Sequence, residues 1–106
     1  MHVGFIVTKT PGETGFKTFL NLVDLYVGKE GITIYLIGNG VYCARIGHKS
    51  GLSIKIIKNS RVKVMRQDLS ARGIEEEQLM EGVESMGSYD EMVHEIMEEF
   101  DQVLSF

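Results

Sequence analysis

The chain has 106 residues, of which 43% are hydrophobic and 25% are charged, with a formal net charge of -4. This composition is typical of a globular domain and excludes an intrinsically disordered segment. No apolar run reaches the roughly 18 residues of a membrane span, and residues 1–7 lack the basic start and cleavage site of a secretion signal. We therefore expect a cytoplasmic protein that has no membrane contact, with one domain over residues 1–106.

The charges are distributed unevenly along the chain. Residues 1–72 hold all 11 Lys and Arg but only four acids, whereas residues 73–106 hold 11 acids and no Lys or Arg. Because these acids stand between well-spaced apolar residues, we interpret them as the solvated faces of helices rather than as a tail for a basic partner. The basic residues are scattered rather than arranged in a stripe, so no direct nucleic-acid binding is expected.

The first third of the chain predicts a strand followed by a helix. Residues 2–8 form a nearly continuous apolar run, as in a strand that is covered on both faces. Thr10 can act as an N-cap, Pro11 fits the first helical position, and Glu13 completes a capping box. Apolar residues then recur at helical spacing over residues 16–27, and glycines at 28 and 31 end the helix.

The middle third predicts two more strands. Residues 32–37 are rich in β-branched residues, as in a buried strand, and the Gly38-Asn39-Gly40 turn ends it. A short helix is expected to begin within residues 41–45, and residues 52–58 favour a second helix. Residues 62–66 form the third strand. Asp68 then caps a single helical turn that Gly73 ends.

The acidic last third predicts two helices and a strand. Residues 75–85 are expected to form an acidic helix with Leu79, Met80 and Val83 pointing inward. Ser88 opens a second capping box. The helix that follows has an apolar face at offsets of 0, 3, 4, 7, 8 and 11 residues, and its members are Tyr89, Met92, Val93, Ile96, Met97 and Phe100. Residues 102–106 are the last strand.

Strands that alternate with helices imply parallel pairing through right-handed crossovers. We therefore predict an α/β fold: a three-layer sandwich around a mainly parallel sheet of four to five strands. Such sheets bind ligands at the carboxyl ends of their strands, a rule that selects the loops at residues 8–12, 38–43 and 66–68. The predicted ligand edge consists of Thr8, Gly38, Asn39, Gly40, Met65 and Asp68.

Cys43 is the candidate catalytic residue. It follows Gly40 at the expected start of a helix, where backbone N–H groups lower the pKa of a thiol. A thiolate there could attack a sulfane sulfur and carry a persulfide. The competing interpretation is a small buried hydrophobe, which is a common role for cysteine. No metal-binding cluster and no complete cofactor motif is recognisable, because Phe16 stands where a phosphate loop needs its second glycine.

Two segments resemble the DsrE/DsrF/DsrH-like sulfur-relay family. IYLIGNGVY at residues 34–42 resembles the family's first strand-and-turn signature, and VKVMRQDLSARGI at residues 62–74 resembles its second. The D-L-x-A-R-G part of the second segment is closest to the DsrH or TusB branch. DQVLSF at residues 101–106 is similar to the terminal strand of the DsrE or TusD branch.

The resemblance implies a flavodoxin-like fold, assembly into oligomers, and work in sulfur relay such as tRNA thiolation or sulfur oxidation. In the DsrE or TusD branch the persulfide-carrying cysteine lies at the end of the third strand, a position that Met65 occupies here. A thioether has no ionisable S–H and cannot carry a persulfide. By lacking a cysteine at this position, the chain resembles the DsrH branch, whose members are partners of the cysteine-bearing subunit.

The leading hypothesis is therefore a sulfur-relay subunit without its own persulfide site, which acts in assembly or partner binding without a cofactor. It would form homo-oligomers, or hetero-oligomers with related subunits. Two alternatives stay open. The chain could be an enzyme, a small sulfurtransferase that uses Cys43, or it could be a binding module for an anion or small ligand at the edge formed by Gly38 and Gly40.

Overall fold

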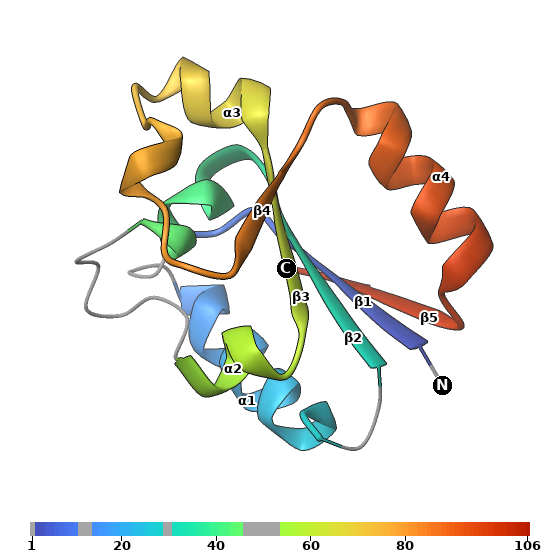
Figure 1. Ribbon diagram of the computed structural model, residues 1–106. Helices are drawn as coiled ribbons and strands as arrows, with labels where there is room; N and C mark the ends of the chain where they lie inside the picture. The colour runs from blue at the N-terminus through green and yellow to red at the C-terminus, as the bar shows by residue number, and fades with distance from the viewer. Residues whose placement is uncertain (1, 11–13, 29–30, 46–53) are drawn as a thin grey trace.

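The computed structural model describes residues 2–10, 14–28, 31–45 and 54–106 of the chain. Figure 1 shows a twisted sheet with helices on both faces, as the sequence predicts. The sheet has five strands in the order β4-β3-β2-β1-β5, and all four pairings are parallel. The strands are β1 (His2–Val7), β2 (Gly31–Leu36), β3 (Arg61–Met65), β4 (Val83–Met86) and β5 (Gln102–Ser105).

Helices cover the sheet on two sides. Helices α1 (Thr14–Tyr26) and α2 (Ile54–Lys58) lie on one face, and α4 (Tyr89–Glu99) lies on the other. Helix α3 (Arg66–Ala71) follows β3 directly at the carboxyl end of the sheet, next to the 3-10 helices η1 (Gly38–Ala44) and η2 (Glu76–Gln78). Within the described residues, no helix is long and apolar enough to cross a membrane.

Each face of the sheet has its own core, because successive strand residues point to opposite sides. Towards α1 and α2 the core is aromatic: the ring of Phe5 contacts the ring of Phe19, and Phe19 contacts Phe16. Towards α4 it is rich in methionine and consists of Tyr35, Met65, Met86 and Met92. Gly4 of β1 leaves room on this side, since a β-carbon there would lie 3.3 Å from the Phe100 ring.

Several predicted boundaries of helices and strands are confirmed. Ser88 caps α4, where its Oγ accepts a hydrogen bond from the backbone N–H of Glu91 at 3.3 Å. The strands expected over residues 2–8, 32–37, 62–66 and 102–106 are each present within one or two residues. Pro11 and Glu13 of the predicted first capping box lie outside the described residues, as do residues 46–53.

The acidic helix predicted over residues 75–85 is wrong. A capping box between Glu75 and Gln78 holds only the single turn of η2, and Gly82 then adopts a positive φ of 96°. That conformation interrupts a helix, and the residues after Gly82 pair with β3 as strand β4. The expectation of helix here failed because parallel pairing is a tertiary interaction that a local acidic pattern does not reveal.

The inward face predicted for α4 is too wide. Met92 is buried and Ile96 is half-buried, but Val93 is 48% exposed and Met97 is 80% exposed. Val93 and Met97 lie on the side of α4 and not on the face that packs against the sheet. That packed face is narrower than the full apolar stripe of the helix. The two side chains are therefore apolar surface.

Candidate functional site at the carboxyl edge of the sheet

The carboxyl ends of β1, β2 and β3 meet at one edge, and the η1 turn crosses it. Gly38 has a φ of 53°, a conformation that residues with a β-carbon rarely adopt. A β-carbon at Gly40 would lie 2.0 Å from the carbonyl oxygen of Val7, so only glycine lets η1 pass the end of β1. Both glycines of the predicted turn are thus required by the backbone.

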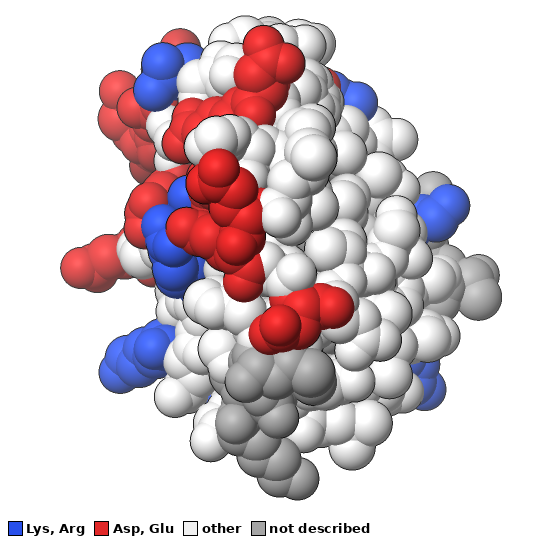
Figure 2. All heavy atoms as spheres, turned by 90° about the vertical axis from the view of Figure 1, so that its right-hand side faces the viewer, with Lys and Arg blue, Asp and Glu red and all other residues white. Residues whose placement is uncertain are grey.

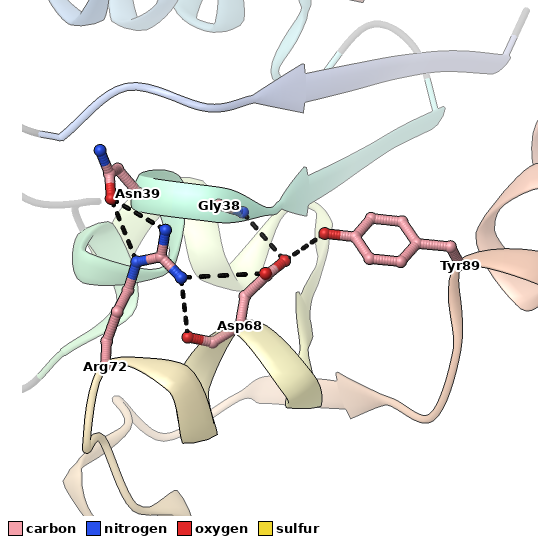
Figure 3. A network of polar contacts seen from close by, with 5 residues as sticks. All are labelled: Gly38, Asn39, Asp68, Arg72 and Tyr89. Carbon is pink, nitrogen blue, oxygen red and sulfur yellow. Dashed lines mark hydrogen bonds and ion pairs between the residues drawn. The ribbon is translucent and has the colours of Figure 1, made fainter.

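Asp68 is the centre of a polar network at this edge (Figure 3). Its Oδ2 accepts hydrogen bonds from the backbone N–H of Gly38, at 3.0 Å, and from the Tyr89 hydroxyl. Its Oδ1 lies 3.8 Å from Nη1 of Arg72. Asp68 is not the N-cap that the sequence predicts, since Met65 holds that position and Asp68 lies in the first turn of α3. Its carboxylate joins neighbouring elements instead.

Arg72 extends the network to the η1 turn. Its Nε and Nη2 donate to Oδ1 of Asn39 at 3.1 and 3.0 Å, and its Nη1 donates to the backbone oxygen of Asp68 at 3.1 Å. Three segments are tied together in this way: η1, α3 and the start of α4. An external anion at the Gly38 N–H would have to displace the carboxylate of Asp68, which already holds that donor.

Tyr89 acts as a hydrogen-bond donor over the physiological range. Burial and the hydrogen bond to Asp68 raise its pKa to about 12, because the charged form would be poorly hydrated and would face a carboxylate. The network therefore contains one carboxylate, one guanidinium and one neutral phenol.

The other predicted edge residues are separate from this network. The Thr8 hydroxyl and backbone N–H both donate to the carbonyl oxygen of Phe106 at 2.8 Å, which ties β1 to the segment after β5. Met65 is fully buried in the core beneath α4. The structure thus brings Gly38, Asn39 and Asp68 together, and places Thr8 and Met65 elsewhere along the edge.

Cys43 is fully buried, and its Sγ donates to the carbonyl oxygen of Lys9 at 3.4 Å. The expectation that it begins a helix is wrong, because it lies near the carboxyl-terminal end of η1. The backbone dipoles at that end oppose a thiolate rather than stabilise it. The carrier role of Cys43 stays a prediction that now requires the thiol to become accessible.

Two functional-looking features were missed from the sequence. Arg72, at the end of α3, and Tyr89, at the start of α4, belong to the Asp68 network. Arg72 is the arginine of the D-L-x-A-R-G segment, which was the available signal, whereas Tyr89 carries no motif of its own. A second network lies under α4, where Lys63 Nζ of β3 is 2.8 Å from both carboxylate oxygens of Glu95. The Tyr35 hydroxyl donates to Glu95 Oε1 at 3.0 Å. Lys63, which stands between Val62 and Val64 in the predicted strand, was the available signal.

No cluster of three or more potential metal ligands occurs among the described residues. His94 lies on the exposed side of α4, where its Nε2 is 3.2 Å from Glu98. The features that remain as candidates for function are therefore the Asp68 network and the surfaces around it.

Comparison with known proteins identifies relatives at two levels. The family described as "DsrH like protein" matches residues 11–103. Among solved structures, the MTH1491 protein of unknown function from Methanobacterium thermoautotrophicum has a TM-score of 0.78 at 18% identity, with 99% of this chain and 98% of that chain covered. The ychN protein of E. coli has a TM-score of 0.75 at 24% identity, with both chains fully covered. No curated relative matches. The two structures share the fold, and the family match over most of the sequence shows that this chain belongs to the DsrH-like family.

Proposed function

We propose that this protein is a cytoplasmic subunit of a sulfur-relay system, such as one for tRNA thiolation or sulfur oxidation, and that it acts in assembly and partner binding. Membership of the DsrH-like family supports the sulfur-relay assignment. The subunit holds or orients a related, cysteine-bearing subunit and does not itself transfer sulfur. It needs no cofactor for this role.

One observation carries the proposal. Met65 stands at the end of β3, where the resemblance to the cysteine-bearing branch places the persulfide carrier, and its side chain is fully buried. A methionine thioether cannot form a persulfide. The sole thiol of the chain, on Cys43, is also fully buried. The arrangement supports a subunit that contributes surface and geometry rather than a reactive sulfur.

The test is a purification from the native host with a tagged copy of this chain. We expect a related family member with a cysteine at the end of its third strand to co-purify. Intact mass after incubation with a sulfane-sulfur donor should show the added sulfur on that partner and not on this chain. A chain that gains sulfur by itself and retains no related subunit would contradict the assembly role.

The alternative, a sulfurtransferase that uses Cys43, has a separate test. The buried thiol should react with an alkylating reagent only at the rate at which the fold opens. Labelling would then accelerate steeply in denaturant. Fast labelling of the folded protein, with a pH midpoint near neutrality, would favour Cys43 as a carrier. Binding of a small anion would instead be detected by a shift of backbone amide signals at Gly38 and Asn39.

A further inference from the structure

A cavity of about 410 Å³ lies beside α3. Its lining comes from α3 and from the segment between α3 and η2, and no residue of the Asp68 network belongs to it. The volume is within the range of about 300–1,000 Å³ that is usual for small-molecule sites. Because α3 follows β3 directly, the cavity lies near the carboxyl end of a strand, where open α/β sheets bind ligands. Its lining residue Arg66 belongs to the loop at residues 66–68 that this rule selects from the sequence.

The inner wall of the cavity is apolar. Leu69 and Ile74 line it although they keep only 1% and 6% of their exposure. Gly73 also lines it, with a φ of 68°, and a β-carbon there would meet no atom within 4 Å. The backbone at Gly73 therefore leaves the space open. An apolar group of a ligand would be removed from water against Leu69 and Ile74, which is favourable.

The remaining lining carries charges of both signs. Arg66 comes from the start of α3, and Glu75 and Glu76 come from the start of η2. The change from the basic to the acidic part of the chain, between residues 72 and 73, falls within this lining. Figure 2 shows how the acids of the chain gather on one side of the view. The cavity thus combines one guanidinium and two carboxylates with an apolar wall.

These charges are available to a ligand. Arg66 makes two long contacts, from Nε to Glu76 Oε1 at 3.5 Å and from Nη2 to the Ser85 hydroxyl at 3.4 Å. The Arg66 and Glu76 side chains are 60% and 59% exposed. Exposed ion pairs contribute little to stability, so a ligand can replace this contact readily. The Glu75 side chain is held in place, because it accepts a hydrogen bond from the backbone N–H of Gln78 in the capping box.

From these observations we propose that the cavity beside α3 binds a small zwitterion with an apolar body, namely a free α-amino acid with an apolar side chain. The guanidinium of Arg66 binds the ligand carboxylate, because its planar donors match the two carboxylate oxygens. The ligand ammonium, which has three donors, binds the carboxylates of Glu75 and Glu76. The apolar side chain of the ligand packs against Leu69 and Ile74.

The mixture of charges selects a zwitterion over simpler ligands. An anion that binds Arg66 is repelled by Glu75 and Glu76, and a cation that binds these carboxylates is repelled by Arg66. An uncharged ligand satisfies neither sign. A zwitterion replaces one weak contact within the protein with two contacts to the ligand and leaves no charge without a partner. This binding site goes beyond the assembly role proposed above and does not depend on it.

The test is a titration of the isotope-labelled full chain with L-leucine and L-phenylalanine, followed through the backbone amide signals. We expect the amides of residues 73–76 to shift, with a dissociation constant of about 1 mM or below. N-acetyl-leucine lacks the ammonium, and leucinamide lacks the carboxylate. Each should bind about tenfold more weakly or worse, because it leaves a charge of the cavity without its partner.

Two variants and a matched control complete the experiment. Arg66→Gln should weaken leucine binding about tenfold or more, and Ser70→Trp should abolish it, since Ser70 lines the cavity and a large side chain there fills it. Arg61→Gln is the control, because Arg61 is an exposed arginine at the opposite end of β3. The amide spectrum shows whether each variant is folded, and either of the two variants is sufficient for the test.

Three results would overturn the site. The first is the absence of a shift at residues 73–76 with both amino acids. The second is binding of N-acetyl-leucine and leucinamide as tight as that of leucine. The third is leucine binding that survives Arg66→Gln and Ser70→Trp, or that Arg61→Gln weakens equally. Co-purification of a related subunit is measured separately, so the assembly role stands or falls independently of this site.

Discussion

Replacing Lys63 with methionine tests the buried ion pair beneath α4. The Lys63 and Glu95 side chains keep only 6% and 14% of their exposure, and Lys63 Nζ bonds to both carboxylate oxygens at 2.8 Å. Methionine preserves most of the aliphatic volume but leaves the Glu95 carboxylate with the Tyr35 hydroxyl as its remaining partner in this network. Removing one partner of a buried pair costs about 3–5 kcal/mol, and we expect the lower end because Glu95 retains some contact with water.

The predicted loss of unfolding free energy is large enough to measure by urea unfolding or by thermal unfolding. For a domain of this size about 1 kcal/mol corresponds to a fall of roughly 4–8 °C in melting temperature, so Lys63→Met should melt more than about 10 °C below the wild type. The double variant Lys63→Met/Glu95→Leu removes both charges and should recover most of that stability. If the single variant loses under about 0.5 kcal/mol, or the double variant is no better than the single, the carboxylate is not buried as argued.

The same pair predicts a pH dependence. Burial by itself would raise the pKa of Glu95, but hydrogen bonds from Lys63 and Tyr35 outweigh it and hold the pKa below the ordinary value of 4.5. A carboxyl with a lowered pKa contributes stability above its unfolded pKa, and that contribution is lost as the pH falls through the folded value. The stability difference between the wild type and Lys63→Met should therefore be largest at neutral pH and shrink in acid.

Three further predictions concern the carboxyl edge and α4. Gly40→Ala should cost about 2 kcal/mol or more in unfolding free energy, because its β-carbon would meet the Val7 carbonyl oxygen at 2.0 Å; a smaller loss would mean that η1 shifts freely. Tyr89→Phe should cost about 1 kcal/mol and remove a tyrosine absorbance change with a pKa of about 12; if the absorbance change that is lost has the ordinary pKa of 10.0 instead, Tyr89 lies away from Asp68. Ser88→Ala should cost about 1 kcal/mol through loss of the α4 cap, and circular dichroism at rising temperature would detect no change if the cap were unimportant.

The pattern of apolar residues was sufficient to predict most elements of this fold. The apolar segments at residues 2–8 and 32–37 became β1 and β2, because buried parallel strands need apolar side chains on both faces, and the shorter predicted strands at residues 62–66 and 102–106 became β3 and β5. The Ser88 cap and the first helix also follow from local sequence patterns. The alternation of strands and helices along the chain predicted parallel strands joined by crossovers. The glycines at 38 and 40 also marked the edge at which the strands end.

The errors and omissions share a cause. Strand β4 is polar and short, and it exists because β3 offers its edge; no local preference distinguishes it from an acidic helix. Asp68 resembled a cap because its true partners, Gly38 and Tyr89, are 30 and 21 residues away.

The sequence by itself determined the α/β class, the family and the absence of a cysteine at the end of β3, because these depend on residue identity and local periodicity. Only the tertiary structure decided that Cys43 is buried, that Lys63 and Glu95 meet under α4, and that Val93 and Met97 face outward. Each of these depends on which surfaces lie opposite one another after packing. That arrangement is set by contacts between distant segments, and a pattern read along the chain does not contain it.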